Sequence, residues 1–176
     1  MILSDPGRIF RLPTIRQPPM DIHDERIPDE LFAAFLDAMP QVSVEAVLEH
    51  DESVLLVRRT NEPAKGEWFW PGTRLYKGET FEQAVRRLAR EELGIEVTIR
   101  RRIGVYNHFW ETANLPDVET THTVNVAYHV QPANGIDELV LDDQHDEYRF
   151  VERVEPGFHE YVRLYLDDSD ILVERS

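Results

Sequence analysis

Apolar residues recur every three to four positions between Thr80 and Gly94, which is the period of an amphipathic helix. Thr80 followed by Gln83 is the pattern of a capping box, so we expect the helix to begin there. Gly94 suits the left-handed position at which many helices end. The inward row consists of Phe81, Val85, Leu88 and Glu92. A carboxylate therefore continues an otherwise apolar row.

The last turn of this helix carries two adjacent acids, Glu91 and Glu92. Both oppose the negative end of the helix dipole, which costs about 0.3–1 kcal/mol for each exposed side chain. Glu92 also follows the buried row, where an unpaired charge costs far more. We therefore expect positive charge nearby, and Arg87 or Arg90 of the same helix is one source.

Alternating apolar and polar residues predict a strand over residues 42–49, and a turn at 50–52 leads into a second strand over 53–59 as a hairpin. Further strands are expected over residues 67–70, 96–106, 121–130 and 148–151, with a short strand or edge segment at 139–141. Helices are expected over residues 29–39 and 158–166, and loops over 60–66, 108–118 and 144–147. This order predicts an α/β (α+β) fold with a mixed central sheet and helices on both faces.

The 176 residues suit a single domain with a sizeable core. We divide the chain into an N-terminal arm, residues 1–27, and a domain, residues 28–176. The arm has four prolines, so we expect extended or irregular structure. Its apolar residues either cover a core edge or a partner subunit, or belong to a loosely ordered tail. They are Ile2, Leu3, Ile9, Phe10, Leu12 and Ile15.

The composition excludes several classes of binding partner and one kind of metal site. A formal net charge of −15 argues against nucleic acid or an anionic membrane surface. Cysteine is absent from the sequence, so a disulfide or thiolate metal site is excluded. The chain has no apolar run near the ~20 residues of a membrane span and no signal-peptide pattern, which favours the cytoplasm. Lysine occurs only at Lys65 and Lys77, and together with the acid excess this favours a salt-rich cytoplasm.

Residues 72–95 resemble the Nudix box, because a glycine turn is followed at the motif's spacing by Glu79, Arg87, Glu91, Glu92 and Gly94. The sequence departs from the box where Thr73 replaces a glycine, Leu88 replaces a glutamate and Ala89 replaces a bulky apolar residue. The resemblance implies a Nudix-like α/β/α sandwich. In this box Glu79 and Arg87 are expected to pair around the turn.

Outside the box, the chain from about residue 29 onward resembles the GDP-mannose mannosyl hydrolase branch of the Nudix superfamily. The matching residues are Thr60-Asn61, Pro63-Ala64, Gly66, Trp68-Phe69, Gly104-Val105, His108-Phe109, Thr120-Thr121-His122, Gln144-His145-Asp146 and Tyr148-Arg149. That branch also lacks part of the glutamate set, in keeping with Leu88. The resemblance implies that water attacks the anomeric carbon of a GDP-sugar, GDP-mannose or GDP-glucose, and that GDP leaves whole.

By this resemblance, the metal ligands are Glu92, the backbone carbonyl of Gly72 and the side-chain amide of Gln144. Glu91, where the branch has alanine, adds a second carboxylate. Oxygen ligands suit Mg²⁺, with Mn²⁺ as an alternative. His145 matches the general base, and its acidic neighbours in the loop are expected to raise its pKa.

The remaining matches concern the substrate. Arg59 and Arg74 match two arginines that bind the leaving diphosphate. His108 and Glu45 match positions that handle the sugar and the leaving group, although the branch has aspartate at Glu45. Thr123 stands where the branch has a tyrosine. Relatives in the branch are dimers, so a homodimer is expected.

Two other functions stay open. Glu91 favours a conventional Nudix pyrophosphohydrolase that cleaves a P–O bond, whereas Leu88 and the Gln144-His145 pair favour the sugar hydrolase. A non-catalytic nucleotide-sugar sensor is the third reading. Trp68 and Trp70 either pack in the core or stack on a nucleotide base.

Overall fold

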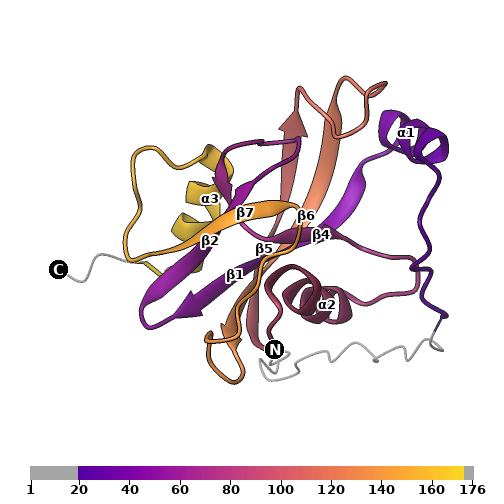
Figure 1. The fold of residues 1–176 in the computed structure, drawn as a ribbon. Coiled ribbons are helices and arrows are strands. Elements are labelled where there is room, and N and C mark those ends of the chain that lie inside the picture. The colour runs from indigo at the N-terminus through magenta and orange to yellow at the C-terminus, as the bar shows by residue number, and fades with distance from the viewer. Residues whose placement is uncertain (1–19, 173–176) are drawn as a thin grey trace, which may run out of the picture.

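The computed structural model describes residues 20–172, and within them the chain forms three helices and seven strands (Figure 1). The helices are α1 (Asp29–Ala38), α2 (Phe81–Leu93) and α3 (Glu160–Ser169). The strands are β1 (Gln41–His50), β2 (Ser53–Arg59), β3 (Trp68–Phe69), β4 (Gly72–Arg74), β5 (Val97–Trp110), β6 (Thr121–Pro132) and β7 (His145–Val151). The apolar positions predicted between residues 2 and 15 of the arm lie outside the described residues.

The sheet is mixed, as expected. Its main strand order is β3-β2-β1-β6-β5, with β4 paired to β1 and β7 paired to β2. The β1–β6 pair is parallel and the other pairs are antiparallel. Helices α2 and α3 cover opposite faces of the sheet, each with its own apolar cluster (Figure 1). The predicted α/β/α Nudix fold is therefore confirmed.

Helix α2 begins and ends where the sequence predicts. Thr80 and Gln83 form both hydrogen bonds of the capping box, and Gly94 adopts a left-handed conformation with φ of 68°. Leu88 and Val85 are fully buried in the core, and the partly buried Phe81 packs against the same cluster. On the opposite face of the sheet, Trp70 is fully buried and stacks on Tyr165 of α3. Trp70 is therefore packed as a core residue.

Several predicted boundaries are wrong. Residues 72–74, expected as a turn, form β4, because their backbone pairs with β1. Strand β5 continues to Trp110, so His108 lies in a strand and not in a loop, because β6 supplies pairing partners as far as Thr121. Residues 139–141 form no strand. Strand β7 already begins at His145, because β2 pairs with it there across a register shift.

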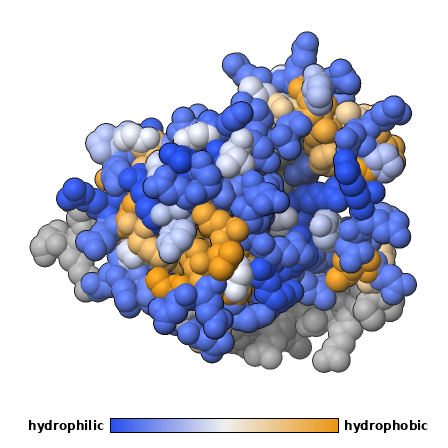
Figure 2. Space-filling model, viewed as in Figure 1, coloured by the Kyte–Doolittle hydropathy of each residue, from blue (hydrophilic) through white to orange (hydrophobic). Residues whose placement is uncertain are grey.

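Helix α1 lies at the edge of the molecule and none of its residues is buried. Figure 2 shows a largely hydrophilic face with several apolar areas, one of them at the upper right near this helix. Leu31, Phe35 and Met39 are the large exposed apolar residues at α1 and its C-terminal cap.

Among residues 20–172, no helix is long and apolar enough to cross a membrane.

Candidate active site

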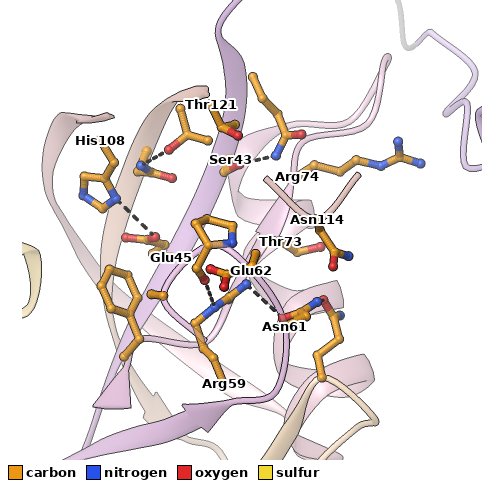
Figure 3. Close-up of a pocket in the computed structure, with 18 of the residues that line it drawn as sticks. Ser43, Glu45, Arg59, Asn61, Glu62, Thr73, Arg74, His108, Asn114 and Thr121 are labelled. Carbon is orange, nitrogen blue, oxygen red and sulfur yellow. Dashed lines mark hydrogen bonds and ion pairs between the residues drawn. The ribbon is translucent and has the colours of Figure 1, made fainter. Parts of the chain in front are cut away.

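A pocket of about 400 Å³ lies against the sheet at the N-terminal part of β1, next to β4 and the end of α2. Eight of the nine predicted site residues line it: Glu45, Arg59, Gly72, Arg74, Glu91, Glu92, His108 and Gln144. Figure 3 shows Glu45 and His108 pointing toward each other at one end, with Arg59 reaching in from another side. The structure thus brings together residues that are up to about a hundred positions apart.

Glu92 is held against the turn that precedes the helix. One carboxylate oxygen accepts a hydrogen bond from the backbone N–H of Gly72 at 3.3 Å. Burial, and then the charge of Asp142, raise the pKa of Glu92 well above its usual value, against the Gly72 hydrogen bond and the charges of Arg59 and Arg87. A side chain at Gly72 would meet Glu45 at 2.9 Å. Glycine therefore lets the backbone and both carboxylates approach closely.

Glu91 has a different environment from its neighbour. It accepts a hydrogen bond from Arg87 at 3.1 Å, and its side chain is 57% exposed. Arg87 also pairs with Glu79, with Nε 2.8 Å from Oε1, and donates to the carbonyl of Arg74 at 2.8 Å. The expected Glu79–Arg87 pair is confirmed as a structural brace. Arg90 pairs instead with Glu96, with the guanidinium 3.7 Å from the carboxylate.

Asp142 is a site residue that the sequence reasoning missed. It lines the pocket, and its carboxylate accepts hydrogen bonds from the backbone N–H and the side-chain amide of Gln144 at 3.2 and 3.1 Å. Its Oδ1 also lies 2.7 Å from Nδ1 of His145. The backbone N–H of Asp142 donates to the carbonyl of Glu92, which ties this segment to α2. The only signal in the sequence was an aspartate two residues before Gln144.

His145 differs from its expected state. It is buried and does not line the pocket. Burial lowers the pKa of His145, and the hydrogen bond and charge of Asp142 oppose this without overcoming it. The expectation of a raised pKa was wrong, because the ring lies inside the fold and not in a solvated loop. Its Nε2 is buried without a hydrogen-bond partner among residues 20–172.

The two arginines are placed for anionic groups. Arg59 donates to the carbonyl of Pro63 at 2.7 Å and to the side chain of Asn61 at 3.1 Å. Burial lowers its pKa, while surrounding carboxylates, Glu45 first, partly offset this. Arg74 lies over the rings of Phe32 and Tyr76, at 5.4 and 5.1 Å from their centroids. Neither arginine forms an ion pair within the described part of the chain, so both charges remain available to a ligand.

Glu45 and His108 are buried residues that line the pocket. Burial raises the pKa of Glu45 to about 7, although Tyr165 and Arg59 favour its charged form. Burial lowers the pKa of His108 to about 3, so this ring is neutral at pH 7. Its Nδ1 lies 3.9 Å from Glu45, too far for a hydrogen bond, and its Nε2 lies 3.0 Å from the hydroxyl of Tyr165. The Oε2 atom of Glu45 is buried with no hydrogen-bond partner among residues 20–172.

The donor set fits a hard cation such as Mg²⁺. The pocket offers oxygen atoms from the side chains of Glu91, Glu92, Asp142 and Gln144 and from the backbone of Gly72. No group of three or more His, Asp or Glu side chains among residues 20–172 forms a metal site by itself. The amide and carbonyl oxygens are therefore needed to complete the ligands. Mutual repulsion of Glu92 and Asp142, which contributes to the raised pKa of Glu92, would be relieved by positive charge.

Comparison with known proteins identifies the family of this chain. The NUDIX domain model matches residues 39–168, and the chain belongs to this family. It is a Nudix hydrolase. The chain is 41% identical over 145 residues to the low-salt glycan biosynthesis protein Agl8 of Haloferax volcanii, covering 82% of this chain and 92% of that one. It is also 32% identical over 112 residues to an ADP-ribose pyrophosphatase of Methanocaldococcus jannaschii, covering 63% of this chain and 61% of that one.

Solved structures support the fold alone. A NUDIX hydrolase from Nitrosomonas europaea superimposes with a TM-score of 0.61 at 22% identity, covering 75% of this chain and 89% of that one. A MutT NUDIX hydrolase from Burkholderia pseudomallei gives a TM-score of 0.58 at 24% identity, covering 74% and 98%.

Proposed function

We propose that this Nudix hydrolase cleaves a GDP-sugar, GDP-mannose or GDP-glucose, to GDP and free sugar in a Mg²⁺-dependent reaction. Water would attack the anomeric carbon, the C–O bond to the diphosphate would break, and the bond pair would leave with GDP. The observation that carries this proposal is the position of Leu88. It occupies the place of a glutamate in the Nudix box and is fully buried in the core. Helix α2 therefore supplies one carboxylate fewer to the pocket than the full motif would.

The metal end of the pocket would hold the diphosphate. Glu92, the carbonyl of Gly72 and Gln144 would hold Mg²⁺, with Asp142 or Glu91 completing the set. When bound, the ion would neutralise charge on the leaving diphosphate. Arg59 and Arg74 would bind phosphate oxygens, because their guanidinium groups have no carboxylate partner among residues 20–172.

We assign the proton acceptor to His145. Asp142 lies at Nδ1, which favours the tautomer that carries its proton there and leaves Nε2 free to accept one. Burial keeps the ring neutral, as a base requires. This role requires the segment beginning at Asp142 to shift so that Nε2 reaches the pocket. Glu45 is the competing acceptor, because it already lines the pocket with an unpartnered oxygen.

A second function has specific support. Glu91 lines the pocket beside Glu92, so two carboxylates of α2 are near a bound diphosphate. One relative carries the name ADP-ribose pyrophosphatase. A conventional pyrophosphohydrolase would use these acids to direct water at phosphorus. The relative named for glycan biosynthesis, over most of this chain's length, favours a nucleotide sugar as the substrate in either reaction.

Hydrolysis in ¹⁸O-labelled water separates the two. We expect the label in the released sugar and none in GDP, because attack at carbon leaves the diphosphate oxygens untouched. Label in a phosphate would establish the pyrophosphohydrolase. No turnover of any nucleotide sugar with Mg²⁺ present would overturn both in favour of a sensor. Size-exclusion chromatography with light scattering tests the expected homodimer in the same preparation.

A further inference from the structure

The sheet face beneath the pocket carries a row of buried polar side chains. Six of the ten buried polar or charged residues among residues 20–172 lie on it, and we call them the polar row: Ser43, Glu45, His108, Thr121, Thr123 and Asn125. The strand registers place them on one face, because His108 and Gln41 both stand opposite Thr123, and Ser43 stands opposite Asn125. All six line the pocket.

Burying a face of polar side chains lowers the stability of a protein. Burying a polar group without a full set of partners costs about 1–3 kcal/mol. Most of the row has a hydrogen-bond partner: Asn125 donates to Thr123 at 2.8 Å, and Ser43 accepts from Gln41 at 3.0 Å. Thr121 donates to the carbonyl of Thr112 at 2.9 Å, and His108 lies 3.0 Å from the hydroxyl of Tyr165. The Oε2 atom of Glu45, whose residue is 7% exposed, has no partner among residues 20–172. This oxygen is therefore placed to accept a hydrogen bond from a ligand hydroxyl, and the hydroxyl groups of the row beside it line the same pocket.

The chemistry of the row selects an uncharged, hydroxyl-rich group. It contains no arginine or lysine, and Glu45 would repel a phosphate. Ser43, Thr121 and Thr123 each both donate and accept, which matches sugar hydroxyls. A nucleobase would need an aromatic face, but Phe69 and Trp110 meet the ring of His108 edge-on at 88° and 84°. One face of His108 is already covered by Tyr161, with parallel rings 3.8 Å apart.

The row also borders the diphosphate end. In the β1–β4 pair, Glu45 stands opposite Gly72 and Ser43 stands opposite Arg74. A hexose joined to a diphosphate at Gly72 and Arg74 would therefore reach the row directly (Figure 3). We propose that Ser43, Thr123 and Asn125 bind the hydroxyl groups of the sugar and determine which nucleotide sugar is accepted. This rests on the proposed nucleotide-sugar substrate but not on which bond is cleaved.

The test compares ligands that differ only in the sugar. Calorimetry with Mg²⁺ would measure the Kd of GDP and of a GDP-mannose analogue whose anomeric oxygen is replaced by a methylene group. Ser43→Ala and Asn125→Leu should weaken binding of the analogue about 10-fold or more and change the Kd of GDP less than about 2-fold. His122→Ala, on the opposite face of β6, is the matched control and should change neither.

An equal loss for GDP and the analogue would overturn the proposal, because the row would then bind the nucleotide. An unchanged Kd of the analogue in both variants would overturn it as well. Thermal unfolding of each variant identifies a folding defect, and Ser43→Ala keeps the test informative if Asn125→Leu does not fold. Because binding is measured without turnover, failure of the hydrolase proposal is visible separately as absent GDP release by the wild-type protein.

Discussion

The carboxylate of Glu92 accepts a hydrogen bond from the backbone N–H of Gly72 at 3.3 Å, although the two residues are 20 positions apart. This contact joins the last turn of α2 to β4, and β4 in turn pairs with β1 next to Glu45. The three segments thus meet where a metal-bound diphosphate is proposed to lie. Glu92 is 3% exposed, and a neutral residue would cost less at this position, so its carboxylate is better explained by a bound cation than by stability.

Glu92→Gln should therefore lower the activity of the protein and raise its stability. We expect kcat/KM to fall about 10²-fold or more, because a principal metal ligand is lost. In the absence of metal the variant should unfold at a higher temperature than wild type, since the neutral amide would place no charge beside Asp142. Enzyme assays and thermal scans check both.

Wild type and Glu92→Gln also test directly whether Glu92 binds the metal. Saturating Mg²⁺ should raise the melting temperature of wild type, since about 100 Kd of ligand stabilises by about 2.7 kcal/mol. The shift should be largely lost in Glu92→Gln and reduced less in Glu91→Gln, because the Glu91 side chain is 57% exposed and is an alternative to Asp142 in the ligand set. A full Mg²⁺ shift in Glu92→Gln would exclude Glu92 as a ligand.

Removing the proposed base should slow turnover without abolishing binding. His145→Ala should lower kcat by about 10²–10⁴-fold and change the Kd of GDP little. Asp142→Asn should give a smaller loss, because it alters how Gln144 and His145 are held. An unchanged rate in His145→Ala, with a large loss in Glu45→Gln, would transfer the proton acceptor to Glu45.

The Glu79–Arg87 brace should dominate the stability of the turn before α2. Arg87→Ala leaves Glu79, whose side chain is 3% exposed, without its partner, so we expect a loss of about 3–5 kcal/mol in the free energy of unfolding. Arg90→Ala on the same helix is the control. Its partner Glu96 is half exposed, and the loss should stay below about 1 kcal/mol. Urea denaturation measures both, and equal losses would contradict the brace.

Glu49 should contribute pH-dependent stability. Burial acts to raise its pKa, but hydrogen bonds from Gln131 and His129 and the charge of His129 bring the net pKa below its usual value. A carboxyl group with a lowered pKa stabilises the fold above its unfolded pKa, and this stabilisation is lost as the pH falls through the folded pKa. At pH 7, Glu49→Gln should therefore lower the free energy of unfolding by about 0.5–1 kcal/mol.

The difference between this variant and wild type should shrink steadily in denaturation series from about pH 5 toward about pH 3. The exposed Glu138 provides a control, because Glu138→Gln should stay within about 0.5 kcal/mol of wild type throughout. A Glu49→Gln difference that is constant with pH would show that the hydrogen bonds act independently of the charge.

Local chemistry allowed much of the fold to be predicted. The capping box and Gly94 determine both ends of α2 through contacts within a few residues. The alternating and apolar runs located the central strands β1, β2 and β6. Consecutive residues of β1 and β2 are nevertheless buried, because helices cover both faces of the sheet. The boundaries of β4, β5 and β7 were missed, since there the decision came from pairing with β1, β6 and β2, partners that lie far away in sequence.

By itself, the sequence determined the Nudix box, the two acids at the end of α2 and eight of the residues that line the pocket. Only the tertiary structure decided which acid is buried, that Asp142 organises Gln144 and His145, and that six polar side chains share one sheet face. The physical reason is the distance along the chain over which each interaction acts. Caps and periodicity act over a few residues, whereas burial, desolvation and pKa depend on which distant strands exclude water from a side chain.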